Sequence, residues 1–358
     1  MVAAGPPVLW NDSADPAALA ESIGFGAVRA TCNPVIALAA IRADLPRWSA
    51  RIRELADEMP DASESDIGWQ VVAEVSLEAA QMLQSTFAEH NGYNGRLSMQ
   101  TDPRLARSKH KLVEQAVHFA SLADNIIVKV PATSVGVEAI EEASYAGVAI
   151  NVTVSFSAAQ ALATGEAIER GLRRREAEGH DTSRLGPVVT IMVGRVDDWM
   201  KEVYDREGIT SFPREYLDWA GVAVFKNAYA EFKRRGLRSR LLAAAYRNLL
   251  QFSEFVGGDV VLSPPFAWQR KIQASGLSAE PRMHLDVDPV ILAALKTMPE
   301  FLKAYELDGM TPAEFDSFGA TRKTLRQFLT ADEELDGIVR DILIPAPWPT
   351  PATAPTKE

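Results

Sequence analysis

Short runs rich in valine, isoleucine and leucine recur along this chain, separated by longer segments with helical spacing. This alternation is typical of parallel strands, because a crossover helix must return the chain to the edge from which each strand starts. An eighth strand could lie at Leu241–Ala245, although its leucine and alanine residues favour a helix. The other seven predicted strands are Val8–Trp10, Ala27–Thr31, Arg96–Met99, Ile126–Val128, Val148–Ile150, Val188–Met192 and Val260–Leu262.

Helix signals fall between the predicted strands. The segment 34–94, before the third strand, has helical spacing and acidic clusters, which predicts an insertion of several helices. Ser157 and Gln160 have capping-box spacing and open an apolar periodic run that we expect to stop near Gly171. Another helix is expected after Arg195, with two aspartates in its first turn, where the helix dipole favours negative charge.

The length and the net charge of the chain limit the classes of protein to which it can belong. The 358 residues suit either two ordinary domains or one large barrel, and we expect a single domain over residues 1–344. The proline-rich tail, residues 345–358, should be extended or disordered. Lysine and arginine total 37 against 48 acidic residues, and this net charge of −11 argues against a general binder of nucleic acid or anionic membranes. An anionic substrate would therefore need a local basic site.

The expected location is the cytoplasm. The single cysteine, Cys32, cannot form an internal disulfide, and no Cys or His spacing suggests a metal site. The first residues lack the pattern of a signal peptide, and no apolar run is long enough to cross a membrane. A reducing, cytoplasmic compartment fits these features best.

Lys129 interrupts the otherwise apolar run at residues 126–131. A lysine amine is rarely buried without a partner, so this position has to be explained. Inside a closed barrel, desolvation would lower its pKa and leave a neutral amine able to attack a carbonyl and form a Schiff base. The alternatives are a side chain that reaches solvent or one that pairs with a carboxylate.

Polar residues follow several other predicted strands. They are Asp12, Asn33, Gln100, and Asn151 with Thr153. The carboxyl ends of the strands are where barrel enzymes keep their catalytic groups. Each residue alone is equally consistent with a turn or a helix cap, but together with a lysine in a strand they favour an active site.

Several motifs together resemble the transaldolase family, over roughly residues 8 to 270. They are Thr31-Cys32-Asn33-Pro34, Gly95–Ser98 with Asp102–Leu105, Ile127–Thr133, Ile150–Thr153 and Val193–Asp197. The resemblance implies an α/β fold, a (β/α)₈ TIM barrel, with a helical insertion before the third strand and extra C-terminal helices. It also implies class I chemistry: a dihydroxyacetone unit moves from a ketose phosphate to an aldose phosphate through a lysine imine. A protonated imine stabilises the carbanion without any metal or cofactor.

The resemblance also assigns roles. Lys129 resembles the Schiff-base lysine, Asp12 the carboxylate that moves the proton of the C4 hydroxyl, and Thr153 the hydroxyl that holds the catalytic water. Arg195 and Arg247 resemble a phosphate-binding pair, since guanidinium forks match phosphate oxygens. From the residues alone, Arg195 could instead pair with Asp197 or Asp198, and Arg247 could be a solvated helix charge. The remaining substrate contacts implied are Asn33, Asn151 and Thr190.

Two departures keep alternatives open. Transaldolases carry a glutamate where this chain has Gln100, which can hold a water but cannot move its proton. Fructose-6-phosphate aldolases have glutamine there, so reversible aldol cleavage is an alternative, although their tyrosine is replaced here by Met192. The loss of the glutamate also allows a third interpretation, a barrel that binds sugar phosphates without catalysis. The second departure is Ala245, which stands where a serine often helps to bind phosphate and leaves that site with fewer contacts.

The resemblance places the chain in carbohydrate metabolism, in the pentose phosphate pathway. The expected partners are small-molecule sugar phosphates, with no nucleic acid and no membrane. The sequence leaves the oligomeric state open, a homo-oligomer included.

Overall fold

The computed structural model describes residues 7–348 and contains a closed barrel of eight parallel strands in sequence order. Strand β1 pairs with β2 on one side and with β8 on the other, which closes the ring. The predicted TIM barrel is therefore confirmed. Its strands are β1 (Val8–Asn11), β2 (Ala27–Thr31), β3 (Arg96–Gln100), β4 (Ile126–Pro131), β5 (Ile150–Thr153), β6 (Val188–Ile191), β7 (Arg240–Ala244) and β8 (Val261–Ser263).

Two strand predictions need comment. The run at residues 241–245 forms β7 as the barrel requires, because burial between β6 and β8 overrides its helical propensity. Strand β5 begins at Ile150, two residues after the predicted start at Val148. The preceding Gly147 adopts a φ of +87°, and the backbone N–H of Val148 donates to the carbonyl of Ala143, so this segment still belongs to the turn after a helix.

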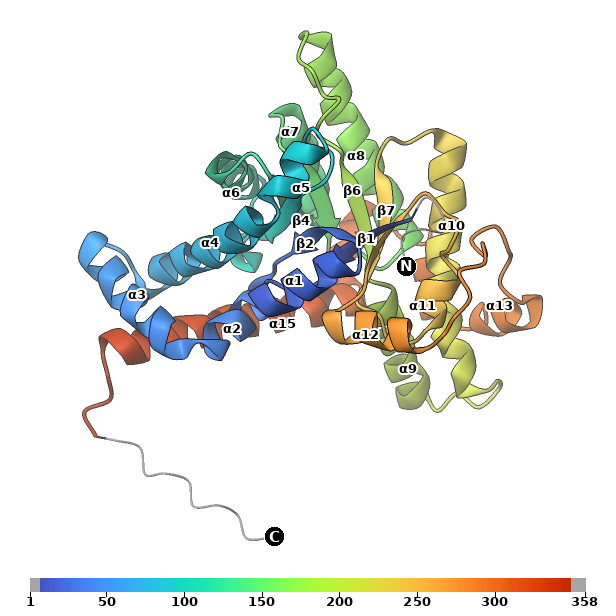
Figure 1. Cartoon of the computed structure of the whole chain (residues 1–358). Coiled ribbons are helices and arrows are strands. Elements are labelled where there is room, and N and C mark those ends of the chain that lie inside the picture. Colours follow the sequence, from blue (N-terminus) through green and yellow to red (C-terminus); the bar gives the residue numbers. More distant parts are fainter. Residues whose placement is uncertain (1–6, 349–358) are drawn as a thin grey trace.

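Helices lie between successive strands (Figure 1). The insertion predicted before the third strand is present as α2 (Pro34–Ala43), α3 (Leu45–Glu58), α4 (Glu64–Met82) and α5 (Gln84–Glu89). The other helices within the barrel are α1 (Pro16–Gly24), α6 (Lys109–Leu122), α7 (Ser134–Tyr145), α8 (Ala158–Ala177), α9 (Val193–Glu207), α10 (Ala220–Arg235) and α11 (Leu250–Ser253). The extra helices expected after the last strand are α12 (Phe266–Ala274), α13 (Pro289–Leu295), α14 (Pro299–Tyr305) and α15 (Gly319–Leu343).

The predicted end of α8 near Gly171 is wrong, because the helix continues to Ala177. A Cβ at Gly171 would lie 2.3 Å from the carbonyl oxygen of Glu141 on α7. This glycine therefore lets two neighbouring helices pack closely and does not end one of them.

Two apolar cores support the barrel. Most buried apolar residues lie between the strands and the surrounding helices. A second cluster, made of alternate strand residues, fills the barrel interior: Trp10, Ile127, Ala149, Val188, Leu242, Ala244 and Val261. Helix α15 runs beside α2, α3 and α4 and also contacts α9 (Figure 1). This long helix brings the C-terminal part of the chain next to loops from both halves of the barrel.

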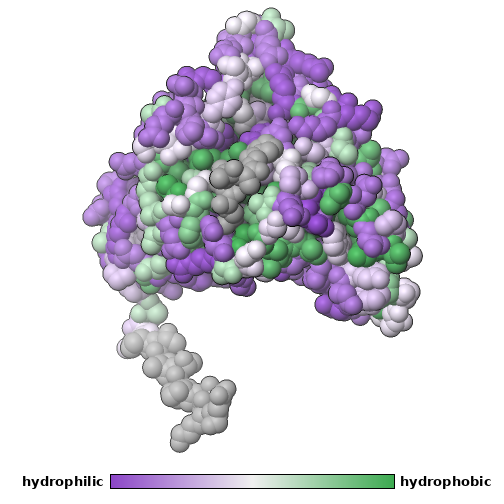
Figure 2. Space-filling model, turned by 45° about the vertical axis from the view of Figure 1, so that its right-hand side comes forward, coloured by the Kyte–Doolittle hydropathy of each residue, from purple (hydrophilic) through white to green (hydrophobic). Residues whose placement is uncertain are grey.

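The outer surface carries many hydrophilic residues. Figure 2 shows hydrophilic residues predominating at the outer margins of the face it presents. Within residues 7–348, no helix combines the length and apolarity needed to span a bilayer. A single domain over residues 1–344 stays a prediction, and residues 349–358 of the predicted tail lie outside the described residues.

Candidate active site

A cavity of about 240 Å³ opens at the carboxyl ends of the strands. Its lining includes Thr31, Met192, Ala245 and Phe328, together with nearly every residue predicted for the site. Only Gln100 among them is not on the cavity wall. The predicted residues that line it are Asp12, Asn33, Lys129, Asn151, Thr153, Thr190, Arg195 and Arg247.

Lys129 reaches this cavity from inside the barrel. It lies opposite Gln100 on β3 and Asn151 on β5, and it is 7% exposed. Burial lowers the pKa of the Lys129 ammonium below its ordinary value, and the carboxylate of Asp12 offsets part of that effect. Among the described residues no carboxylate forms an ion pair with Lys129. The side chain is therefore neither solvated nor neutralised by a partner, the two alternatives that the sequence left open.

Asp12 is held by a neighbouring strand. The hydroxyl of Thr31 donates to Oδ1 of Asp12 at 2.6 Å. This hydrogen bond fixes the orientation of the carboxylate toward the cavity that Lys129 also lines. Sequence reasoning gave Thr31 no role. Thr31 lies two residues before Asn33, and alternate residues of an extended segment share a face, so this spacing could have indicated that Thr31 faces the same side as Asn33.

Asn151 connects three strands through its side chain. Its Nδ2 donates to the hydroxyl of Ser98 at 2.9 Å, and its Oδ1 accepts from the hydroxyl of Thr190 at 2.8 Å. The amide is fully buried, so these bonds fix which way it faces. One N–H of the amide is not used in these two bonds and is the group that Asn151 can offer to a substrate.

Asn33 caps a helix as well as lining the cavity. Its Oδ1 accepts from the backbone N–H of Ile36 at 3.0 Å, at the start of α2. The amide nitrogen is left to donate into the cavity. Thr153 is 3% exposed at the end of β5, and Gln100 is 4% exposed. The Oε1 atom of Gln100 has no hydrogen-bond partner among the described residues.

Arg195 is held against α15. Its Nη1 donates to the hydroxyl of Thr324 at 3.0 Å, and its guanidinium lies 5.6 Å from the ring of Phe328. Burial lowers the pKa of Arg195 to about 10, and the like charge of Arg247 adds to the effect. An anion between the two arginines would relieve this repulsion. Sequence reasoning missed Thr324 and Phe328, since nothing local links residues so distant in the chain.

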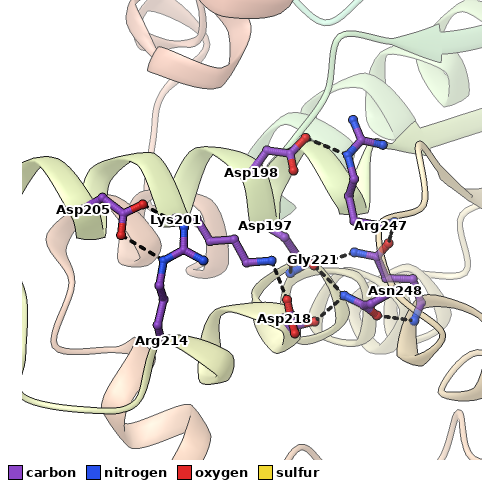
Figure 3. A network of polar contacts seen from close by, with 10 residues as sticks. Asp197, Asp198, Lys201, Asp205, Arg214, Asp218, Gly221, Arg247 and Asn248 are labelled. Atoms are coloured by element: carbon purple, nitrogen blue, oxygen red, sulfur yellow. Dashed lines mark hydrogen bonds and ion pairs between the residues drawn. The ribbon is translucent and has the colours of Figure 1, made fainter.

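Arg247 follows β7 and is held by acceptors around it (Figure 3). Its Nε donates to Oδ2 of Asp198 at 2.9 Å, and its Nη1 donates to the carbonyls of Ala245 and Tyr246. Arg247 lies outside any helix and is partly exposed to solvent, and Asp198 pairs with it and not with Arg195.

The expected positions of Asp197 and Asp198 in the first helical turn are wrong, because α9 already begins at Val193. Asp197 is fully buried and accepts from the backbone N–H of Gly221 and from the side chains of Asn248 and Gln251 (Figure 3). Burial raises the pKa of Asp197 well above its ordinary value. This carboxyl group ties α9 to α10 and to the loop after β7.

Comparison with known proteins identifies the family. The family described as Transaldolase/Fructose-6-phosphate aldolase matches residues 9–314. This chain belongs to that family. Its curated relatives include proteins named Transaldolase from Mycobacterium bovis (strain BCG / Pasteur 1173P2), 30% identical over 63% of this chain and 57% of the relative. Those from Saccharopolyspora erythraea and Renibacterium salmoninarum are 31% and 32% identical over 63% and 58% of this chain.

The match to these relatives is partial in length. The aligned part covers 57%, 61% and 54% of the Mycobacterium, Saccharopolyspora and Renibacterium proteins, respectively. The chain thus spans less than two thirds of the transaldolases it matches. Family membership confirms the resemblance inferred from the motifs.

Proposed function

We propose that this chain is a transaldolase, which moves a dihydroxyacetone unit from a ketose phosphate to an aldose phosphate through a Schiff base on Lys129. The observation that carries the proposal is the buried Lys129 amine, which shares one cavity with the carboxylate of Asp12 and two arginines. The names of the relatives support the same reaction. We place it in the pentose phosphate pathway of the cytoplasm.

The first step is attack by nitrogen. A neutral amine is the nucleophile, and burial of Lys129 favours that form. Nζ adds to the C2 carbonyl of the ketose, and a proton moves from nitrogen to the carbonyl oxygen to give a carbinolamine. With one further proton, taken from solvent or another group, the hydroxyl leaves as water and a protonated imine remains. Gln100 lies opposite Lys129 and Thr153 lines the cavity, so their side chains are the groups we assign to holding this water. The amide side chain of Gln100 cannot supply the proton needed for this step, so solvent or another group must supply it.

The second step breaks the bond between C3 and C4. The Asp12 carboxylate takes the proton from the C4 hydroxyl, the aldehyde departs, and the electron pair of the bond is delocalised onto the imine nitrogen. Thr31 orients Asp12 for this transfer. The retained three-carbon enamine then attacks the carbonyl of the acceptor aldose, and Asp12 returns the proton to the new hydroxyl.

The substrate is oriented by its hydroxyls and its phosphate. Asn33 and Asn151 each have an amide N–H available to a substrate oxygen, while Thr190 keeps the Asn151 side chain in place. Arg195 and Arg247 line one side of the cavity and form its local positive site. These two arginines give this acidic protein the local positive charge that an anionic substrate requires.

The proposal is tested by trapping the imine. Fructose 6-phosphate and borohydride should leave one three-carbon adduct per chain on Lys129, located by peptide mapping, and the Lys129→Met variant should gain none. Lys271 and other exposed lysines of the same digest are internal controls. Binding of fructose 6-phosphate without an adduct would reject catalysis and leave a sugar-phosphate-binding barrel.

Product analysis separates transfer from cleavage. We expect release of glyceraldehyde 3-phosphate to depend on an acceptor such as erythrose 4-phosphate. Release of free dihydroxyacetone without an acceptor would instead support the aldolase reaction, which Gln100 favours. The Gln100→Glu variant adds a direct comparison, since a carboxylate there can move a proton and should raise the rate of transfer.

A further inference from the structure

A second cavity, of about 680 Å³, lies at the opposite end of the barrel. Its walls include Val8, Val188, Arg240 and Val261, which are the first residues of β1, β6, β7 and β8. It is therefore the amino-terminal mouth, and it shares no lining residue with the active-site cavity. In a barrel this face ordinarily serves stability, so a cavity large enough for a metabolite is unexpected here.

Two buried arginines at this mouth form no ion pair with a described carboxylate. Arg29 on β2 and Arg96 on β3 are register partners, and each is 7% exposed. Neither forms an ion pair with any described carboxylate. Arg96 donates to the carbonyls of Gly92 and Arg184, and Arg29 donates to the carbonyl of Tyr93. Buried charges in proteins are normally paired. Asp124 offsets part of the charge of Arg96 without forming an ion pair, whereas Arg29 has no ion-pair partner within residues 7–348.

The cavity itself is lined by Arg29, and the geometry fixes that side chain. Its guanidinium lies 5.0 Å from the ring of Trp10, and its Nε atom is buried without a hydrogen-bond partner in the described part of the chain. Burial, together with the like charges of Arg96 and Arg240, lowers the pKa of Arg29 to about 9. A cation stacked in place and destabilised by its surroundings is a site that an anion would stabilise.

The acidic residues of the mouth are already engaged. Asp259 pairs with Arg240, Glu176 pairs with Arg238, and Asp181 accepts from the backbone N–H of Ser183. Asp259 and Glu176 thus neutralise the outer arginines, whereas Asp181 keeps its negative charge at the rim. The inner arginines, Arg29 and Arg96, form no ion pair with a described carboxylate, and a phosphate dianion offsets two positive charges better than a single carboxylate does.

We propose that the amino-terminal mouth of the barrel binds a phosphate monoester. The phosphate lies against Arg29 with the charge of Arg96 behind it, and the body of the ligand packs on Val8, Val188 and Val261. Thr182 and Ser183 line the same cavity, and since their hydroxyls already donate to Glu176 and Asp181, they can only accept hydrogen bonds from the ligand. This site is separate from the substrate cavity and does not depend on the proposed reaction.

Equilibrium dialysis with radiolabelled inorganic phosphate at about pH 8, where phosphate is a dianion, tests the proposal. The comparison is made in the Arg195→Gln background, which weakens the anion site in the other cavity. We expect one bound phosphate per chain there and none after the further change Arg29→Leu. No bound phosphate in Arg195→Gln, or binding that survives Arg29→Leu, overturns the proposal.

A second pair of variants tests the site even if the Arg29→Leu variant fails to fold. Ser183 is exposed on the rim, so Ser183→Glu and Ser183→Gln should both fold. The glutamate should weaken phosphate binding by about threefold or more through charge repulsion, and the neutral glutamine by much less. Equal affinities in the two variants would contradict the site. Trapping at Lys129 should be unchanged in both, which separates failure here from failure of the proposed reaction.

Discussion

The carboxylate of Asp198 accepts a hydrogen bond from Nε of Arg247 at 2.9 Å, and both side chains are 38% exposed. One of the two arginines of the proposed phosphate site is thus partly neutralised before any substrate binds. The carbonyls of Ala245 and Tyr246 hold the same guanidinium independently, so its position does not rest on the ion pair alone.

We therefore expect Asp198→Asn to strengthen binding of phosphorylated substrate. The asparagine keeps an acceptor for Arg247 but removes a negative charge beside it, so KM for fructose 6-phosphate should fall about two- to fivefold at low salt and less at high salt. Asp205→Asn is the matched control, because Asp205 pairs with Arg214 farther along α9 (Figure 3). A KM that rises, or an equal effect of both variants, would contradict this reading.

Gly194 makes the close packing of the two arginine-bearing segments possible. A Cβ there would lie 1.9 Å from the carbonyl oxygen of Ala245 and 2.7 Å from Cγ of Arg247. Gly194→Ala should therefore lower the free energy of unfolding by about 2 kcal/mol or more and reduce the yield of trapped adduct. Gly337→Ala, in α15, meets no atom within 4 Å and should stabilise by up to about 1 kcal/mol in the same urea titration. Similar losses in both variants would reject the steric argument.

The sequence predicted the barrel well because the signal is local. Each strand is a short apolar run, and the polar residues that follow it must meet at one rim once the ring closes. The run at residues 241–245 was the exception, since its propensity favours a helix. The resemblance that assigns Arg247 to the phosphate site requires a strand before it, and the pairings of β7 with β6 and β8 agree with that strand.

The parts that could not be predicted depend on tertiary packing. Thr324 and Phe328 reach Arg195 only because α15 crosses the end of the barrel, and no local pattern announces that crossing. The choice of Asp198 as partner of Arg247 also depends on how α9 meets the loop after β7. Arg29 and Arg96 are visible in the sequence as charges within predicted strands. Whether a carboxylate pairs with them depends on tertiary packing, which the sequence does not show.

Lys129→Met should stabilise the fold while removing the reactive amine. The pKa of Lys129 is lowered in the folded protein, so the folded state binds fewer protons than the unfolded state in the window below the ordinary value of 10.5. The cost of burying the charge is thus largest at low pH and disappears as the pH rises to that value. The midpoint of thermal unfolding should rise on the order of 2 °C at about pH 6, and the gain should shrink toward about pH 10. A gain that grows with pH would show that burial does not destabilise the charged amine.

Burial of Asp332 makes the stability of the fold depend on pH in the opposite direction to burial of Lys129. It lies on α15, 3% exposed, and its Oδ2 is 3.9 Å from Nε of Arg104, which instead donates to both carboxylate oxygens of Asp102. Burial raises the pKa of Asp332 to about 8, the negative charge of Asp102 adds to this, and Arg104 opposes it.

Because that pKa is raised from 3.8, the folded state holds a proton that the unfolded state has lost, and stability falls as the pH rises from about 4 to about 8. Asp332→Asn removes this dependence, so its advantage over the unaltered protein in urea should grow across that range and reach about 2 kcal/mol or more at pH 8. Asp341→Asn, exposed on the same helix, is the control and should show no such growth. An advantage that is constant or that declines with pH would mean that Asp332 is ionised in the folded protein, with Arg104 as its effective partner.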